Sequence, residues 1–518
     1  MNKLSRTEYS IRNILVNFAG FGLNLLLSFI CRVIFVHYLK TEYLGINGLF
    51  SNILSMLSLT ELGIGTAIVY ALYRPIEENN TGKLASLVHL FGNAYRIIGC
   101  IVAVIGLALL PFLKIIIKEP PNINDNLKII YILFLFSSAS SYFFSYRATI
   151  LTANQRNYIV NGINYCFVIV QNILQILILV LSRNYLLYLI VQIICTFASN
   201  FFISLKATHD YPYITEKHPT PLSRSEKWTL VKNVKALVII KLSGLLVNNT
   251  DNIVITYFNG LITTGVVSNY LLIVNTVSSL AYIVFTSLSA SIGSLNATDD
   301  DNHKYLIFKS LNLINYWIYG WSAIGIAVLS SDVVRFFFGA QYITSFSICI
   351  ILAINFYMLG MQSVVGIYKT TMGLFRHGQY VLFATAIINV IGDIFLGKAF
   401  GVFGIFLATA IARLITNTWF EPYVVYRYGL KKNFGKYLVR YFNYAVLLCI
   451  TGTICFFICK MIHTEQLPQL LIKTGICIVI PNTLFLLAFH KLPEFKTMTS
   501  LLNNYRIKLV SKLLKKTD

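Results

Sequence analysis

Residues 157–206 read NYIVNGINYCFVIVQNILQILILVLSRNYLLYLIVQIICTFASNFFISLK. Two apolar runs, 158–181 and 185–206, flank a short polar turn in which Arg183 is the single charged residue. A helix needs about 20 apolar residues to cross a hydrocarbon core about 30 Å thick. The stretch therefore predicts two membrane-spanning helices joined by a tight turn.

The same pattern of an apolar run followed by a short polar turn repeats over the whole chain of 518 residues. Hydrophobic residues make up 56% of the chain and charged residues only 12%, whereas a soluble domain carries about 25% charged residues. This composition excludes a soluble multi-domain protein, which would need polar linkers. The runs predict an all-α, polytopic membrane protein with about fourteen transmembrane helices.

The distribution of Lys and Arg predicts the orientation of these helices. The formal net charge is +22, and the largest basic clusters lie between Lys206 and Lys235, at Arg427–Arg440 and in the tail from Lys491. All three fall on one side of the predicted spans, and basic short loops face the cytoplasm. We therefore predict a multi-pass protein of the bacterial cytoplasmic (inner) membrane with both termini in the cytoplasm. The scatter of basic residues over many loops argues against a nucleic-acid partner.

The nine cysteines lie mostly inside apolar runs. They form no C-x-x-C pair and no metal-ligand spacing, so the sequence predicts neither a disulfide framework nor a zinc site. No cofactor is expected beyond a coupling ion.

A weak internal repeat relates the two halves of the chain at a shift of about 220 residues. The segment HYLKTEYLGINGLF aligns with YFNGLITTGVVSNY, which places Gly45 over Gly265, and a second alignment places Gln171 over Asp393. Parallel repeats of this kind build transporters whose substrate path lies between two lobes. The predicted parts are an N-terminal six-helix lobe (1–206), a cytoplasmic inter-lobe linker (207–233), a C-terminal six-helix lobe (234–430), two additional transmembrane helices (431–490) and a basic cytoplasmic amphipathic tail (491–518).

Several segments resemble a known transporter family, in order, over nearly the whole chain. The segment EYLGINGLFSNILSMLSLTELGIGTAIVYALYRPIEEN (42–79) resembles the signature of bacterial polysaccharide repeat-unit flippases, the O-antigen and capsule translocases of the multidrug/oligosaccharidyl-lipid/polysaccharide exporter superfamily. The other matching segments are NNTDNIVITYFNGLITTGVVSNY (248–270), SIGSLNAT (291–298), NYWIYGW (315–321), TMGLF (371–375) and EPYVVYRYGLKK (421–432). One departure is the stretch YKTT (368–371), where family members often carry an Arg-Asp or Arg-Glu pair, so a charge pair is missing from that stretch.

The resemblance implies a function in the biosynthesis of a surface polysaccharide, such as lipopolysaccharide O-antigen, capsule or exopolysaccharide. The implied substrate is an oligosaccharide repeat unit linked to undecaprenyl pyrophosphate, which is flipped from the cytoplasmic to the periplasmic leaflet by alternating access. No reaction is catalysed. Membrane lipids and the cognate polysaccharide polymerase are the expected partners, and a monomer is expected because one chain contains both lobes.

Ionisable residues inside a span indicate function, because each costs at least roughly 2.5–3.5 kcal/mol at a helix centre. The cations could line a wet cavity and bind the pyrophosphate, with Arg suited to bidentate contact. The alternative is that they pair with the acids and fix the helices, for example Arg32 with Asp251. Glu61 either hydrogen-bonds across helices or pairs with a cation during closure. The seven residues are the cations Arg32, Arg96, Lys241 and Arg413 and the acids Glu61, Asp251 and Asp393.

Four oxygen-bearing side chains predict a site for a coupling cation in the C-terminal lobe. Asp251 lies in the predicted span 234–258, Asn389 and Asp393 lie one helical turn apart on one face of the span 379–400, and Thr409 lies at similar depth on the next span. Oxygen ligands suit a hard cation such as Na⁺, and a carboxylate could equally carry a proton. The arrangement is similar to the sodium site of lipid II flippases in the same superfamily. The alternative is that neighbouring helices satisfy Asn389 and Asp393.

Two other functions stay open. A membrane glycosyltransferase or polymerase would act through a sizeable external loop bearing acids or arginines, and no predicted external loop exceeds about fifteen residues. A drug or metabolite exporter of the same superfamily would share the helices, but four cations inside the spans favour an anionic substrate.

Overall fold

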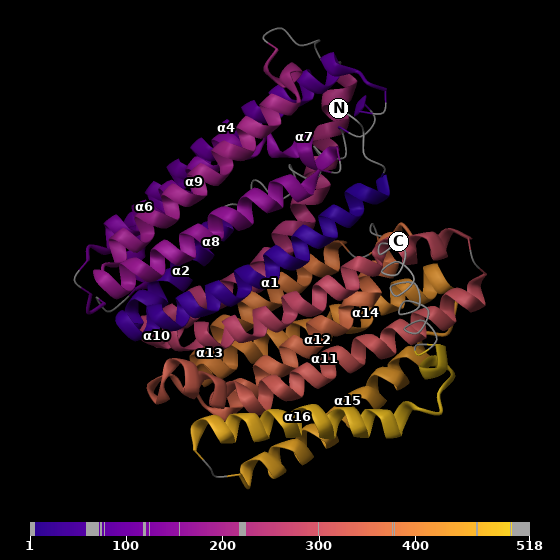
Figure 1. The fold of residues 1–518 in the computed structure, drawn as a ribbon. Helices are drawn as coiled ribbons and strands as arrows, with labels where there is room; N and C mark the ends of the chain where they lie inside the picture. The colour runs from indigo at the N-terminus through magenta and orange to yellow at the C-terminus, as the bar shows by residue number, and fades with distance from the viewer. Residues whose placement is uncertain are drawn as a thin grey trace, which may run out of the picture. The chain divides into compact units, whose positions relative to one another are not determined.

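The computed structural model describes residues 6–57, 72, 75–76, 78–117, 121–123, 125–154, 156–216, 224–298, 300–374, 377, 379–462, 465–497 and 499. Within these residues the secondary structure is helical and contains no strand (Figure 1). Eleven of the described helical segments are long and apolar enough to cross a membrane. The prediction of an all-α, polytopic membrane protein is therefore confirmed.

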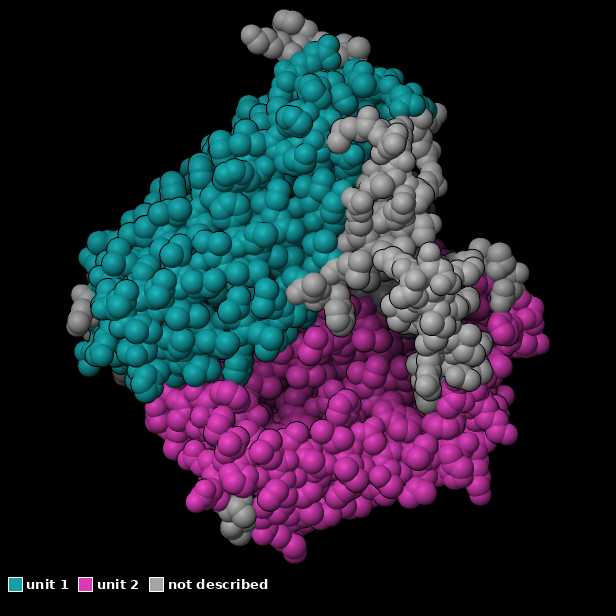
Figure 2. Space-filling model, viewed as in Figure 1, with its two compact units in different colours: residues 1–265 teal, residues 266–518 magenta. Residues whose placement is uncertain are grey.

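The chain divides into two compact units, residues 1–265 (unit 1) and residues 266–518 (unit 2), which Figure 2 shows in different colours. This division falls inside a helix rather than in the polar segment 207–233. The predicted lobe and linker boundaries stay predictions.

Unit 1 is a layered arrangement of long helices. α8 packs against both α1 and α9, α9 packs against α6, and α6 packs against α4 (Figure 1). The sequence thus folds back on itself through tight turns, as predicted for residues 157–206. The described long helices are α1 (Arg6–Tyr38), α2 (Thr41–Leu57), α4 (Thr81–Leu109), α6 (Leu127–Ser145), α8 (Asn157–Leu181), α9 (Tyr185–Asp210) and the first part of α10 (Arg224–Thr298).

Unit 2 is built around α11, which packs against α12, α15 and α16. Its core contains large aromatic side chains, among them Phe308, Tyr316 and Tyr426, each fully buried. The described helices after α10 are α11 (Asp301–Phe338), α12 (Phe346–Thr371), α13 (Gln379–Ile415), α14 (Asn417–Val424), the π-helix η6 (Val425–Leu430), α15 (Gly435–Lys460) and α16 (Gln466–Phe489).

α13 is a hairpin of two helical arms that turns at Gly401, where φ is 59° and ψ is −140°. Thr385 and Thr416 are joined by a hydroxyl hydrogen bond of 2.7 Å, and Asn389 and Thr409 by a hydrogen bond of 3.0 Å. In each pair one residue precedes Gly401 and the other follows it, and the pair that is nearer to Gly401 is nearer on both arms. The two arms therefore run antiparallel. Only glycine adopts this positive φ without steric cost. The predicted end of the span 379–400 is confirmed.

α10 contains a similar turn at Gly260, where φ is 83°. The hydroxyl groups of Thr256 and Thr264, on either side of the turn, lie 2.9 Å apart and are buried. Gly260 thus separates the two predicted spans that flank it. A tight turn also joins α1 and α2 at Leu39–Lys40. The turn at Gly260 lies about 220 residues after it, which is the shift of the predicted internal repeat.

The two helices predicted as additions to the repeat, α15 and α16, are part of the core of unit 2. Trp317 on α11 donates its indole N–H to Asn482 Oδ1 on α16 at 2.6 Å. The rings of Tyr316 and Tyr444 stack with their centroids 4.3 Å apart. Such aromatic contacts stabilise beyond the area they bury.

Ion pairs tie the same two helices to α11 at both ends. Lys473 on α16 lies 2.8 Å from Asp332 on α11. At the opposite end, Glu494 accepts from Lys309 on α11 at 2.8 Å and from Arg440 on α15 at 3.4 Å. The amphipathic helix predicted for the tail cannot be compared with the structure beyond residue 499, because residues 500–518 lie outside the described part of the chain.

Candidate functional site

The hairpin α13 encloses a cluster of three polar side chains. Asn389 and Asp393 lie one turn apart on the first arm, and Thr409 lies opposite them on the second arm. Asn389 Nδ2 donates to Asp393 Oδ1 at 3.0 Å and to Thr409 Oγ1 at 3.0 Å. Asn389 and Asp393 are 0% exposed and Thr409 is 3% exposed. The structure brings these three of the four predicted residues into contact, and their role as a cation site stays a prediction.

Small residues bring the two arms close enough for this contact. A β-carbon at Gly392 would lie 2.9 Å from the β-carbon of Ala408, and one at Gly404 would overlap the carbonyl oxygen of Leu396. Small residues at a helix–helix contact let the backbones approach in a membrane. Gly392 and Ala408 directly precede Asp393 and Thr409, so the tightest contact lies beside the polar cluster.

The cluster places a carboxyl group in the apolar interior of a membrane protein. An ionised carboxylate there is costly unless a cation or hydrogen-bond donors compensate its charge. The Asn389 amide spends its N–H donors on Asp393 and Thr409, and its Oδ1 has no hydrogen-bond partner among the described residues. In this arrangement the amide nitrogen of Asn389 faces the oxygens of Asp393 and Thr409, so a hard cation would bind all three side chains only after the amide flips and presents Oδ1.

The fourth predicted ligand, Asp251, belongs to unit 1. It lies half-buried on the first arm of α10, one turn before Ile255, which is fully buried. The structure brings together Asn389, Asp393 and Thr409 within unit 2. The participation of Asp251 in the same site stays a prediction, as does its pairing with Arg32.

Arg413 lies one turn beyond Thr409 on the second arm of α13. Its Nη1 donates to the main-chain oxygen of Asn355 at 3.2 Å and to Asn355 Oδ1 at 3.4 Å. Asn355, on α12, also donates to the carbonyl oxygen of Phe406 at 2.8 Å. Arg413 is half-buried and is held at the contact between α12 and α13. It therefore ties the second arm of α13 to α12, and its role toward a substrate stays a prediction.

The other predicted substrate cations lie in different surroundings. Arg32 is half-buried on α1, and Arg96 is exposed near the middle of α4. The backbone of Lys241 is in α10, but its side chain lies outside what the structure describes, as does the whole of Glu61. An exposed arginine inside an apolar helix is rare, since lipid gives it no partner. Arg96 is thus the most unusual of the described cations.

Sequence reasoning missed a buried ion pair at the end of α12. Lys369 Nζ lies 2.8 Å from Glu421 Oε1 on α14, and their side chains are 10% and 12% exposed. The stretch 368–371 carries no charge pair within itself, but Lys369 finds its partner 52 residues later. The position of Glu421 inside an apolar run was the signal that could have revealed this pair.

Comparison with known proteins gives the fold. No family model and no curated protein sequence matches the chain. The structure is similar to that of the lipid II flippase MurJ in an inward-closed conformation, with a TM-score of 0.68 and 16% identity over 92% of this chain and 99% of that one.

Two MATE transporters are also similar to this chain in structure. An inward-facing multidrug resistance MATE family transporter of the MOP superfamily gives a TM-score of 0.57 and 14% identity over 79% of this chain and 95% of that chain. A mutant of the Vibrio cholerae MATE transporter VcmN gives a TM-score of 0.53 and 15% identity over 83% of this chain and 98% of that chain. The chain therefore has the fold of MOP-superfamily transporters and is a multi-pass membrane protein.

Proposed function

We propose that this chain is a transporter that flips a lipid-linked oligosaccharide across the cytoplasmic membrane and catalyses no reaction. The observation that carries the proposal is the likeness to a lipid II flippase over 92% of the chain. The segments that resemble polysaccharide repeat-unit flippases narrow the proposed substrate to a repeat unit on undecaprenyl pyrophosphate.

Charge supports an anionic substrate. Arg32, Arg96 and Arg413 are arginines in apolar helices, and Lys241 adds a fourth cation on α10. A guanidinium binds two phosphate oxygens at once, and a cation in a low-dielectric surrounding attracts an anion strongly. We propose that these residues contact the pyrophosphate during flipping.

We also propose that a cation drives the transport cycle by binding to Asp393. The carboxylate, Asn389 Oδ1 and Thr409 Oγ1 would hold Na⁺, or Asp393 would carry a proton instead. A bound cation compensates the charge of the Asp393 carboxylate, so burying this group costs less in the loaded form than in the empty form. The two forms would therefore favour conformations of α13 that differ in how much water reaches Asp393. A ligand shifts a conformational equilibrium by its difference in affinity for the two states.

The second candidate is a drug or metabolite exporter. The likeness to MATE transporters, at a TM-score of 0.57 over 79% of this chain, favours it on the fold. The arginines inside apolar helices favour the flippase, because an exporter of cationic drugs would gain nothing from them.

The test uses cells in which the only copy of the gene can be shut off. Undecaprenyl-pyrophosphate-linked repeat units are quantified in each leaflet after shut-off, with wild type, Arg96→Ala, Asp393→Asn or an empty vector supplied back. We expect accumulation facing the cytoplasm, and clearance by wild type only. Lys128→Ala, at an exposed position at the start of α6, is the matched control and should clear like wild type.

Drug efflux in the same cells separates the two candidates. Repeat units that reach the periplasmic face without the protein would refute the flippase proposal. A simultaneous gain of drug sensitivity would then support the exporter.

A further inference from the structure

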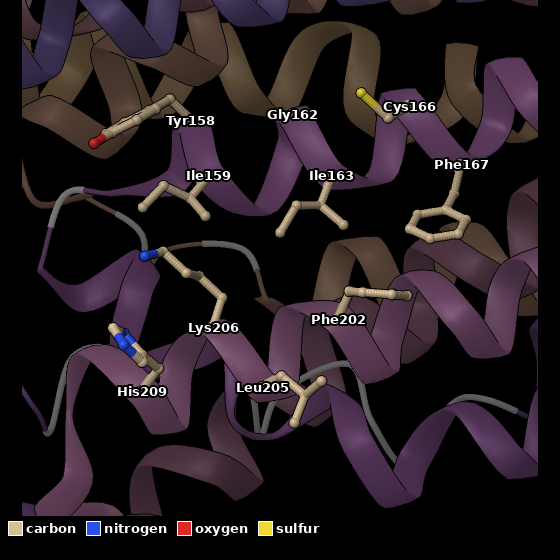
Figure 3. A pocket seen from close by; sticks show the side chains of 10 residues that line it. All are labelled: Tyr158, Ile159, Gly162, Ile163, Cys166, Phe167, Phe202, Leu205, Lys206 and His209. Carbon is tan, nitrogen blue, oxygen red and sulfur yellow. The ribbon is translucent and has the colours of Figure 1, made fainter.

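A groove runs between α8 and α9 in unit 1, with a volume of about 690 Å³. Figure 3 shows Ile163 and Phe167 of α8 facing Phe202 and Leu205 of α9 across it. Phe202 and Leu205 are 51% and 47% exposed, so the groove is open to the surroundings of the helices. Its size falls within the range of roughly 300–1,000 Å³ that is typical of ligand sites.

One end of the groove is polar. Tyr158, Lys206 and His209 lie together at the end formed by the start of α8 and the last turns of α9, and the aromatic rings of Phe167 and Phe202 lie at the other end (Figure 3). This grouping follows from the antiparallel course of α8 and α9. The groove itself is lined by apolar surface, and the polar groups of Tyr158, Lys206 and His209 lie at its rim at one end.

The polar end carries a net positive charge. Asp210 Oδ2 accepts from Arg156 at 2.9 Å, and its Oδ1 accepts from Lys206 at 2.9 Å and lies 3.2 Å from His209 Nδ1. One carboxylate, only 2% exposed, therefore faces two permanent cations and one histidine. The Lys206 side chain is 41% exposed and that of His209 is 84% exposed. Because an ammonium has three donors, Lys206 can bind a second acceptor while it holds Asp210.

We propose that this groove binds an anionic phospholipid of the surrounding leaflet, with its phosphate at Lys206 and His209 and an acyl chain between α8 and α9. The apolar lining lies on helices that span the membrane, so the molecules that reach it are lipids. The excess positive charge at one end complements a phosphodiester. The charged end of the groove lies on the side of the spans that the distribution of Lys and Arg predicts to face the cytoplasm, where the leaflet is rich in anionic lipids.

A headgroup-selective site differs from ordinary lipid contact in one measurable way. Any apolar helix face touches acyl chains, whatever headgroup they carry. A groove with a cationic end binds an anionic lipid more tightly than a zwitterionic one of the same chain length. Each basic residue near a membrane surface contributes about fivefold in affinity for anionic lipid.

The experiment measures that selectivity by photo-crosslinking. The full-length protein is placed in phosphatidylcholine nanodiscs with a trace of phosphatidylglycerol that carries a diazirine on its acyl chain, and labelled peptides are mapped. We expect labelling within 158–167 and 202–209. Unlabelled phosphatidylglycerol should compete at a mole fraction at which phosphatidylethanolamine, a zwitterionic lipid, does not.

Two variants and two controls locate the site. Ile163→Trp fills the groove and should abolish the competed labelling, whereas Ile173→Trp, at a 46% exposed position on α8 outside the groove, should not. Lys206→Gln should raise the phosphatidylglycerol needed for half-competition about fivefold. Lys128→Gln, at the opposite end of the unit 1 helices, should leave it unchanged. If Ile163→Trp does not fold, Leu205→Trp replaces it.

Three outcomes would overturn the proposal. Equal competition by both lipids would show unselective contact only. Labelling that survives both the groove-filling and the charge variants would place the lipid elsewhere. Competition by undecaprenyl-pyrophosphate-linked sugar without competition by phosphatidylglycerol would assign the groove to the transported lipid instead, a result that leaves the proposed function standing.

Discussion

Gly45 on α2 and Gly265 on α10, which the predicted internal repeat aligns, lie against each other's helices. A β-carbon at Gly265 would lie 2.7 Å from the carbonyl oxygen of Thr41 and 3.1 Å from the backbone nitrogen of Gly45. A β-carbon at Gly45 would overlap the carbonyl group of Leu261. The contact therefore joins backbone to backbone, and the same residue type meets the same requirement in both repeats.

Gly45→Val should destabilise unit 1. The obstacle is a backbone carbonyl, which no change of rotamer can move away, so the helices must separate. We expect a loss of about 1–3 kcal/mol, the range for overpacking, and a lower melting temperature in detergent. Gly22→Val is the matched control, because a β-carbon there meets nothing within 4 Å. Equal melting temperatures for the two variants would contradict the close contact.

Asp393→Asn should abolish cation-dependent stabilisation without unfolding the protein. The amide keeps the shape and a hydrogen bond to Asn389 but loses the charge that attracts a cation. A bound ion stabilises the folded state by about 2.7 kcal/mol at roughly 100 times its Kd. Melting temperatures are compared in Na⁺, in Li⁺ and in choline, and across pH.

Asp301→Asn, on the first turn of α11, is the control for the loss of an aspartate. It should keep the full response to the ion. A sodium response that persists in Asp393→Asn would remove the cation site from α13. A response to pH alone would assign the proton to this carboxyl.

Glu421→Gln should destabilise unit 2 more than the loss of an exposed ion pair does. The change leaves the Lys369 ammonium, which is only 10% exposed, without its carboxylate. Breaking one side of a buried pair costs roughly 3–5 kcal/mol. The comparison is Asp301→Asn, whose partner Lys304 lies at 3.9 Å and whose own side chain is 50% exposed. Chemical denaturation measures both, and similar losses would show that solvent screens the Lys369–Glu421 pair.

Stability should fall in acid because of Glu494, which follows the membrane-spanning helix α16. Burial would raise the pKa of Glu494, but the hydrogen bond and charge of Lys309 and the charge of Arg440 outweigh it and hold the pKa below 4.5. A depressed pKa contributes stability that is present above the unfolded-state value and is lost as pH falls through the folded-state value. We expect the melting temperature to be flat near neutral pH and to fall below about pH 4.5.

Glu494→Gln tests the assignment of this pH dependence. The variant should melt lower than wild type at about pH 7 and lose less on acidification, so the two curves approach each other. Glu465→Gln, at an exposed position before α16, should keep the wild-type dependence. Parallel curves for Glu494→Gln and wild type would assign the acid sensitivity to another group.

The helical hairpins show how far local sequence reaches. Gly260 and Gly401 interrupt long apolar runs, and the structure turns at both because glycine alone accepts their positive φ. Asn389 and Asp393 share a helix face by their spacing of four, so their contact follows from helix geometry. Thr409 joins them because it lies on the returning arm of the same hairpin. The greater part of the candidate site could therefore be predicted.

Contacts between distant helices were beyond such reasoning. The sequence treated α15 and α16 as additions, yet Trp317 and Tyr316 pack against them in the core of unit 2. Lys369 has no acid nearby in sequence and pairs with Glu421 on another helix. Arg413 donates to Asn355 on α12, a contact between helices that the sequence did not identify.

The sequence by itself determined that this protein is an all-α membrane protein and where many of its helices end, and it predicted a weak repeat between the two halves. Lipid requires long apolar runs, and glycine and polar residues mark the turns, so this information is local. Only the tertiary structure decided which charges pair, which polar groups meet and where α8 and α9 leave the groove between them. Those features depend on how side chains on distant helices pack. Hydrophobic periodicity predicts which face of a helix is buried, but not which residues of another helix that face contacts.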